Sequence, residues 1–385
     1  MSISVKEREF MTKEDLEEVE FGKAFVKPKQ TRHYQCIYWS QKGKGSCVCP
    51  SSTIREKEKN FQANWRIKAN RKKMKDEGNK PCEGIKEECE YFEYPIPYIP
   101  EYDDNFILDL DTAETISFAL NDNDNLLIVG PPGCGKSSHV MQMASLLNWE
   151  TVRFSCTDQM TYSKIIGQWV IVGDTMVWVD GDILDAFRHG KILIEEEVDF
   201  MDPSLRGSVH TIMEQGGTLT LTGINPKTGG HMRETVDRHP DFRWISTANT
   251  IGLGDDSFLY HGTTLMNAAA RDRYSVIMNM DYPSPETEAD IVFNKVNESL
   301  DNGKTIERDT VESMITVANV VRDAFKGKQC NFPFTIRRML AWGKYMVQKG
   351  SKEGTKLSII NFCNPSDQIF LRGVIETRMG LRIEI

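Results

Sequence analysis

A phosphate-binding loop constrains this chain more than any other feature of its sequence. The string GPPGCGKSS, residues 130–138, matches the pattern G-x-x-x-x-G-K-[ST]. An apolar run, NLLIVG, precedes it and a helix-like run follows it, which is the context that this motif requires. Glycines let backbone N–H groups converge on phosphate oxygens, and the start of a helix adds positive potential. The chain is therefore expected to contain an α/β domain built around a nucleotide.

We predict that every residue of this loop lines the nucleotide. Lys136 is expected to reach the β and γ phosphates, and the Ser137 hydroxyl to bind Mg²⁺. The thiol of Cys134 lies inside the loop and is expected to make it sensitive to alkylation or oxidation. The residues predicted to contact ATP are Gly130, Pro131, Pro132, Gly133, Cys134, Gly135, Lys136, Ser137 and Ser138.

Five short apolar runs alternate with helix-like segments between about residues 106 and 283. The runs are NLLIVG, TVRFSC, KILIEE, FRWISTAN and YSVIMNMD. Strand–helix alternation predicts a parallel sheet covered by helices on both faces. After DYPSPE the pattern is helical to the end, which predicts a smaller α-helical lid. We divide the chain into a Cys-containing, basic N-terminal region (1–94), the α/β domain (95–283) and the lid (284–385).

The third apolar run ends in crowded carboxylates. Glu195, Glu196 and Glu197 follow one another, and Asp199 lies just beyond. Neighbouring acids repel one another unless cations offset their charge. A nucleotide-binding loop needs one carboxylate beside Mg²⁺, and a second can orient and deprotonate the attacking water. We assign Glu196 to the metal and Glu197 to the water; the alternative is a strand that runs out into a solvated acidic loop.

Together these motifs resemble those of AAA+ ATPases, within the MoxR branch and its cobaltochelatase CobS-type members. The resemblance covers residues 100 to 385. Residues 158–197 are similar to the family's insertion in helix 2 and the following strand, and residues 216–249 to its hairpin before the fourth strand. Residues 357–380 are similar to the C-terminal stretch of CobS-type proteins. In the family the acidic strand ends in Asp-Glu, whereas here Glu196 holds the Asp position.

The resemblance implies roles for two further polar residues. Asn249 matches the sensor-1 Asn, which would contact the γ-phosphate or the catalytic water. A buried Asn needs a partner, so a structural cap is the alternative for Asn249. Arg337 matches the sensor-2 Arg and would touch phosphate from the lid. At 100° per residue its neighbour Arg338 would point away.

Two arginines precede the last apolar run of the α/β domain. In the family, an Arg in this stretch faces the ATP of the next subunit. Arg273 is our candidate for this arginine finger and Arg271 is the reserve. A guanidinium arriving in trans would stabilise charge on the γ-phosphoryl oxygens. A surface salt bridge between Arg273 and Asp272 is the alternative.

Residues 1–94 carry a cluster of metal-ligand types. His33 accompanies five cysteines there, and the spacings are not paired C-x2-C motifs. Zinc, buried free thiols and an iron–sulfur cluster are therefore all open. The cysteines considered for Zn²⁺ are Cys36, Cys47, Cys49, Cys82 and Cys89.

Charge in the N-terminal region is also uneven. Residues 55–80 hold ten Lys or Arg against four Asp or Glu, with Phe61 and Trp65 on one helical face. This segment could follow a nucleic-acid backbone or dock onto a partner. We favour docking because acids are interleaved and the chain has a net charge of −9. The chain has no run of 18 apolar residues and begins without an apolar signal region, so we expect no membrane span and a cytoplasmic protein.

The resemblance implies an ATP-hydrolysing motor that uses ATP and Mg²⁺ to remodel a partner. An arginine supplied in trans requires head-to-tail contacts, which close into a ring, and the family suggests a hexamer. A von Willebrand A-domain protein is the implied partner. One alternative is the motor subunit of a cobaltochelatase that inserts cobalt into a corrin ring. Another is a nucleic-acid-linked ATPase that uses the N-terminal region as a binding module.

Overall fold

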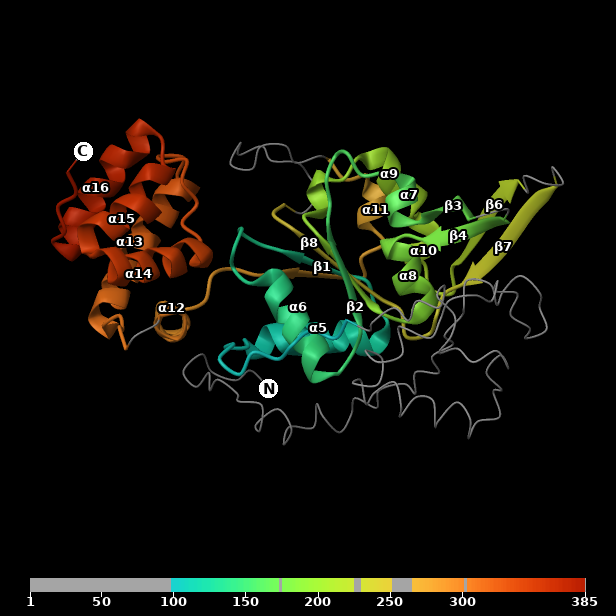
Figure 1. Ribbon diagram of the computed structural model, residues 1–385, viewed down its shortest axis with the longest axis horizontal. Helices are drawn as coiled ribbons and strands as arrows, with labels where there is room; N and C mark the ends of the chain where they lie inside the picture. Colours follow the sequence, from blue (N-terminus) through green and yellow to red (C-terminus); the bar gives the residue numbers. More distant parts are fainter. Residues whose placement is uncertain (1–97, 173–174, 225–229, 251–264, 301–302, 385) are drawn as a thin grey trace, which may run out of the picture. The chain divides into compact units, whose positions relative to one another are not determined.

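The computed structural model describes residues 98–384, except 173–174, 225–229, 251–264 and 301–302. A five-stranded parallel sheet forms the centre of the α/β domain, in the order β2-β5-β8-β1-β9 (Figure 1). Each strand falls within one of the five apolar runs, so the predicted parallel sheet is confirmed. The strands are β1 (Leu126–Val129), β2 (Thr151–Ser155), β5 (Ile192–Glu196), β8 (Arg243–Ala248) and β9 (Val276–Asn279).

Helices cover both faces of this sheet, as the buried apolar runs require. On one face, α5 (Leu110–Asp122) and α6 (Lys136–Leu146) pack on alternate residues of the central strands. Figure 1 shows the other helices of the domain on the opposite side of the sheet. These are α7 (Tyr162–Ile165), α8 (Asp182–His189), η2 (Val198–Phe200), α9 (Pro203–Ser208), α10 (His210–Met213) and α11 (Ala268–Arg271).

Two β-hairpins are inserted between the strands of the main sheet. The first pairs β3 (Gly167–Val172) with β4 (Thr175–Asp180). The second pairs β6 (Thr218–Ile224) with β7 (His231–Asp237) in antiparallel register, with Thr218 opposite Asp237. Both lie within the segments that resemble the family's two insertions, and the predicted hairpin before the fourth sheet strand is confirmed.

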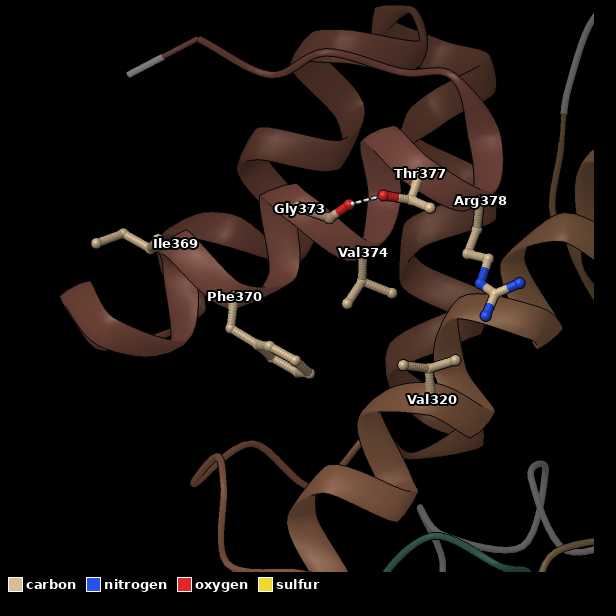
Figure 2. Close-up of a pocket in the computed structure, with 7 residues that line it drawn as sticks. All are labelled: Val320, Ile369, Phe370, Gly373, Val374, Thr377 and Arg378. Atoms are coloured by element: carbon tan, nitrogen blue, oxygen red, sulfur yellow. Dashed lines mark hydrogen bonds between the residues drawn. The ribbon is translucent and has the colours of Figure 1, made fainter.

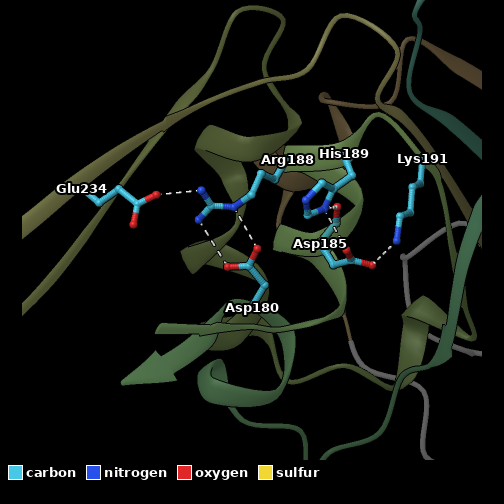
Figure 3. A network of polar contacts seen from close by, with 6 residues as sticks. All are labelled: Asp180, Asp185, Arg188, His189, Lys191 and Glu234. Carbon is cyan, nitrogen blue, oxygen red and sulfur yellow. Dashed lines mark hydrogen bonds and ion pairs between the residues drawn. The ribbon is translucent and has the colours of Figure 1, made fainter. Parts of the chain in front are cut away.

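One arginine on α8 joins residues from both hairpin segments. The Arg188 guanidinium donates to Asp180, at the end of β4, over 2.8 Å and to Glu234, in β7, over 2.7 Å (Figure 3). On the same helix Asp185 accepts from Lys191 Nζ at 2.6 Å. Through Arg188 these pairs connect Asp180, at the end of β4, and Glu234, in the middle of β7, to the same helix.

The C-terminal region is a helical bundle with its own apolar core. Its elements are α12 (Pro285–Glu298), α13 (Arg308–Lys326), α14 (Ile336–Lys349), α15 (Ser351–Ser358), η3 (Ile360–Phe362) and α16 (Pro365–Met379). Trp342 is fully buried in this core, and its indole N–H donates to the Thr355 hydroxyl at 2.8 Å. The predicted helical lid is therefore confirmed as an α-helical unit.

A shallow groove lies on the surface of the bundle between α13 and α16. Its volume is about 390 Å³, and its lining combines Val320, Phe370 and Val374 with Arg378 (Figure 2). Ile369, at its edge, is 75% exposed.

In the described part of the chain, no helix has the length and apolar composition needed to cross a bilayer.

Candidate nucleotide site

The loop between β1 and α6 depends on glycine at three of its positions. Gly133 and Gly135 have φ angles of 69° and 103°, in the left-handed region that favours glycine. At Gly130, an added Cβ would lie 2.1 Å from the carbonyl oxygen of Met280. The backbone of Met280 therefore lies too close to Gly130 for a side chain to fit there. This tight backbone leads directly into α6, whose first N–H groups are available to an anion.

Lys136, the first residue of α6, is held by three oxygen atoms. Its ammonium donates to the carbonyls of Gly130 at 2.7 Å and Pro131 at 3.0 Å, and to Asn249 Oδ1 at 3.1 Å. Burial lowers the pKa of Lys136, and the carboxylates of Asp199, Glu197 and Glu196 act against that shift. Phosphate oxygens can replace the oxygen partners of Lys136, so these residues fit a bound nucleotide.

The loop after β8 is held in place by a buried acid that the sequence analysis did not assign. Asp199 accepts hydrogen bonds from the backbone N–H groups of Asn249 at 3.0 Å and Thr250 at 3.2 Å. Burial raises the pKa of Asp199, and these hydrogen bonds oppose the shift. Asp199 thus fixes the backbone of Asn249, whose side chain contacts Lys136. The sequence signal that could have identified Asp199 was its position two residues after Glu197.

Glu195 and Glu196 point to opposite faces of the sheet, as adjacent strand residues must. Glu195 is fully buried on the face opposite α6 and pairs with Arg206 at 3.0 Å. Glu196 instead forms a two-point ion pair with Arg153 on β2, at 2.7 and 2.9 Å. Ser155 Oγ adds a longer contact to Glu196 at 3.4 Å. Arg153 has no local signal in the sequence, because its pairing with Glu196 is set by the register of β2 against β5.

Glu197 has a strained backbone. Its φ and ψ are 55° and 45°, a left-handed conformation that few non-glycine residues adopt. Strain of this kind costs about 1–3 kcal/mol and concentrates at functional sites. The turn exposes the Glu197 side chain at the carboxyl end of β5. Glu197 is therefore separated from the ion pair that holds Glu196, and it can take a different role.

The chemistry of the donor set suits Mg²⁺. Mg²⁺ takes oxygen ligands and keeps several waters, which a hydroxyl and one or two carboxylates can complement. The Ser137 hydroxyl and the Glu196 carboxylate would hold the ion beside the phosphates, with Glu197 next to Glu196 at the strand end. When bound, Mg²⁺ neutralises charge on the β and γ phosphates.

Arg273 lies near the amino ends of the parallel strands, whereas the phosphate loop follows the carboxyl end of β1. Its carbonyl accepts from the Asn125 side chain at 2.8 Å, so it is level with the residue before β1. The loop begins at Gly130, five residues further along, which is about 16 Å at strand spacing. The guanidinium donates to the carbonyls of Ala269 and His210, and pairs with the Glu214 carboxylate at 3.1 Å. Arg273 therefore cannot reach its own loop.

The alternative partner for Arg273, Asp272, takes no part in these contacts. The ion pair that forms joins Arg273 to Glu214 instead. Arg271, the reserve residue, is the last residue of α11 and is half-buried. Both arginines thus stay on the edge of the domain where β9 begins.

In the lid, the two arginines at the start of α14 have different surroundings. Arg338 packs on the ring of Phe362, with its guanidinium carbon 4.0 Å from the ring centre, and donates to the carbonyl of Ser358. Arg337 is exposed. It is thus the member of the pair that is accessible to a ligand.

The thiol of Cys134 is buried within the phosphate loop. Cys134 is 1% exposed, and burial raises the pKa of its thiol. The expected sensitivity to alkylation is therefore not supported, because a buried, protonated thiol is a poor nucleophile.

The five cysteines considered for zinc, and the basic segment with Phe61 and Trp65, lie outside the described residues. Within residues 98–384, apart from the gaps given above, no group of three or more His, Cys, Asp or Glu side chains is arranged to hold a metal ion.

The fold and this site define a P-loop nucleotide-binding protein. Residues 125–273 match the model of the AAA domain, dynein-related subfamily. The aerobic cobaltochelatase subunit CobS of Sinorhizobium sp is 31% identical over 293 residues, which are 74% of this chain and 85% of CobS. Protein NorQ of Paracoccus denitrificans is 25% identical over 253 residues, 66% of this chain and 81% of NorQ. Protein CbbQ of Hydrogenophilus thermoluteolus is 28% identical over 185 residues, 48% and 63% of the two chains.

The chain belongs to the AAA+ ATPases, in the MoxR branch that includes CobS. It is therefore an ATP-hydrolysing motor protein, and the predicted family and activity are confirmed. Among solved structures, the P216G mutant of RuvB from Thermotoga maritima is similar with a TM-score of 0.40 at 15% identity, over 74% of this chain and 76% of RuvB.

Replacing Gly130 with alanine tests the close approach of the loop to Met280. We expect Gly130→Ala to lower the free energy of unfolding by about 2–3 kcal/mol, because the new Cβ meets backbone. ATP binding should weaken as well. The matched control is Gly207→Ala in α9, where nothing lies within 4 Å of the added Cβ. Urea unfolding and ATP titration measure both effects, and equal stability of the two variants would contradict the prediction.

Replacing Arg153 tests whether Glu196 faces the metal. Arg153→Gln removes a positive charge from Glu196, so Mg²⁺ should bind more tightly. A change of about 1 kcal/mol, the upper range for an exposed ion pair, corresponds to roughly fivefold. The measurement is a Mg²⁺ titration of binding of a non-hydrolysable ATP analogue. Arg153→Lys keeps the charge and is the control. An unchanged Mg²⁺ dependence in Arg153→Gln would remove Glu196 from the metal site.

Proposed function

We propose that this ATPase works as a ring in which each ATP lies between two subunits. This proposal rests on the position of Arg273. It lies just before the amino end of β9, and its carbonyl accepts a hydrogen bond from Asn125. A guanidinium there is separated from its own loop by the length of β1. It can act on nucleotide only in a neighbouring subunit, and such head-to-tail contacts close into rings. Six subunits is the number that the family resemblance suggests.

Within each site, residues from two subunits share the chemistry. Ser137 and Glu196 hold Mg²⁺, and Glu197 accepts the proton of the attacking water. Asn249 orients that water or the γ-phosphate from the position that Asp199 fixes. Arg273 arrives from the next subunit, with Arg271 in reserve. Arg337, exposed at the start of α14, contacts phosphate from the lid and links hydrolysis to lid movement.

We infer that the ring uses this cycle to remodel a partner protein, with a von Willebrand A-domain protein as the adaptor. The alternative is a cobaltochelatase motor subunit, which the likeness to CobS over 85% of that protein favours. Co-purification with an A-domain protein supports either function, whereas a chelatase also requires a tetrapyrrole-binding large subunit. ATPase stimulation by DNA or RNA with a steep salt dependence would instead indicate a nucleic-acid-linked motor.

The role of Glu197 is tested by removing its charge alone. Glu197→Gln should bind ATP with unchanged affinity, while kcat falls by about 10²–10⁴-fold because the general base is lost. With ATP bound and not hydrolysed, the variant should accumulate as a stable oligomer in sedimentation. Glu312→Gln, the same change on an exposed position of α13, is the control and should retain full activity. Normal turnover by Glu197→Gln would show that another group activates the water.

The shared site is tested by mixing two inactive variants. Arg273→Ala subunits keep their loop, and Lys136→Ala subunits keep their arginine finger. Each variant alone should be inactive, and a 1:1 mixture should recover up to about a quarter of wild-type activity, since one interface in four combines both intact halves. Arg271→Ala in place of Arg273→Ala is the control for the finger assignment. A mixture no more active than its separate components would contradict the shared site.

A further inference from the structure

A chain of buried hydrogen bonds connects the finger segment to the sheet. The Tyr274 hydroxyl donates to Ser246 Oγ at 2.8 Å, and Ser246 Oγ donates to Glu195 at 2.7 Å. Arg206 closes the group by donating to Glu195 at 3.0 Å and to the Tyr274 oxygen at 3.3 Å. Tyr274 is 4% exposed, Arg206 is 3% exposed, and the other two are fully buried. These four residues form what we call the Tyr274 network.

Three of the four network residues lie close in sequence to a residue of the proposed reaction. Glu195 directly precedes Glu196 on β5, and Ser246 lies on β8, three residues before Asn249. Tyr274 directly follows Arg273. The network therefore joins the acidic strand, the sensor strand and the finger segment, although it lies on the sheet face opposite α6.

The finger segment is also held from its other side. Asn125, which is 6% exposed, donates through its side-chain amide to the carbonyls of Arg273 and Met213, both at 2.8 Å. The backbone of Arg273 is thus fixed by Asn125, while the next side chain is anchored in the sheet by its hydroxyl. The Arg273 side chain is 26% exposed, and its guanidinium makes the surface contacts described above. The backbone of Arg273 and the Tyr274 side chain are therefore anchored independently of the guanidinium, which would exchange its contacts to meet a nucleotide.

Stability alone does not account for the network. Buried charge pairs are often no more stabilising than apolar side chains of similar volume. Here Glu195 Oε1 and Arg206 Nη2 are buried without hydrogen-bond partners among the described residues, which adds a further cost. Tyr274 would pack equally well as phenylalanine if only its ring mattered. The hydroxyl adds direction, because it fixes where the segment lies along the sheet.

We propose that Tyr274 is a positioning residue for the arginine finger: its bond to Ser246 sets the place from which Arg273 meets the nucleotide of the neighbouring subunit. This proposal rests on the proposed function, in which Arg273 acts in trans. A small displacement of a catalytic group can reduce turnover by up to about a hundredfold. Tyr274 should therefore affect the rate in the neighbouring site and leave nucleotide binding to its own subunit unchanged.

The first measurement uses Tyr274→Phe, which keeps the ring and removes the hydroxyl. We expect ATP affinity to stay at the wild-type value and kcat to fall about tenfold. In the Arg273→Ala background, Tyr274→Phe should leave the small residual turnover, measured at high enzyme concentration, unchanged, because the residue acts through the arginine. Tyr345→Phe, on an exposed tyrosine of α14, is the matched control and should leave kcat unchanged. Additive losses in the double variant would overturn the proposal.

The decisive experiment places Tyr274→Phe on one side of the shared site at a time. In the first mixture, the finger donor carries Lys136→Ala and Tyr274→Phe, and the acceptor carries Arg273→Ala. In the second, the acceptor carries Arg273→Ala and Tyr274→Phe, and the donor carries Lys136→Ala alone. We expect activity about tenfold lower in the first mixture and unchanged in the second, relative to the mixture without Tyr274→Phe. A purely structural effect would reduce both.

The outcomes separate this proposal from the proposed function. If the mixture without Tyr274→Phe recovers no activity, the shared site fails and the positioning role fails with it. If that mixture recovers activity but the donor change has no effect, only the positioning role of Tyr274 is overturned. Should Tyr274→Phe fail to fold, as judged by circular dichroism, Ser246→Ala on the donor removes the acceptor of the same hydrogen bond. Loss confined to the donor side would again support the proposal.

Discussion

The ammonium group of Lys136 is the interaction on which the site depends. It is bound by the carbonyls of Gly130 and Pro131 and by Asn249 Oδ1, so one charge joins the loop after β1 to the end of β8. That contact is available because β1 and β8 are neighbours in the sheet. A buried cation must keep oxygen partners. Exchange of these oxygens for phosphate would therefore change the position of both strand ends together.

The crowded acids of residues 195–199 are tolerated because the backbone separates them. Strand alternation places Glu195 against Arg206 on one face and Glu196 against Arg153 on the other. The left-handed turn at Glu197 then ends the strand, and Asp199 is satisfied by backbone N–H groups of the next loop. Repulsion among the four carboxylates is thus reduced by separate cations for Glu195 and Glu196, by backbone donors for Asp199 and by exposure of Glu197 to solvent.

The strands and the loop could be predicted because their signals are local. A strand buried on both faces appears as an apolar run, and the loop needs glycine where φ is positive. The pairs Arg153–Glu196 and Tyr274–Ser246 could not be predicted, because they depend on the order and register of strands far apart in sequence. The burial of Cys134 was missed for the same reason, since it follows from packing around the loop.

In the proposed ring, the separation of Arg273 from its own loop would give the fold a simple control over hydrolysis. The phosphate loop and Arg273 lie at opposite ends of the parallel strands, so a subunit alone would not complete the proposed site. The same sheet fixes the distance between Arg273 and the loop. Asn125, just before β1, binds the Arg273 carbonyl, and Tyr274 binds Ser246 on β8. The loop and Asn249 follow the carboxyl ends of these two strands. A subunit that shifts its strand ends on binding ATP would therefore move the arginine that it offers to its neighbour. On this view, coupling between sites passes through the strands themselves.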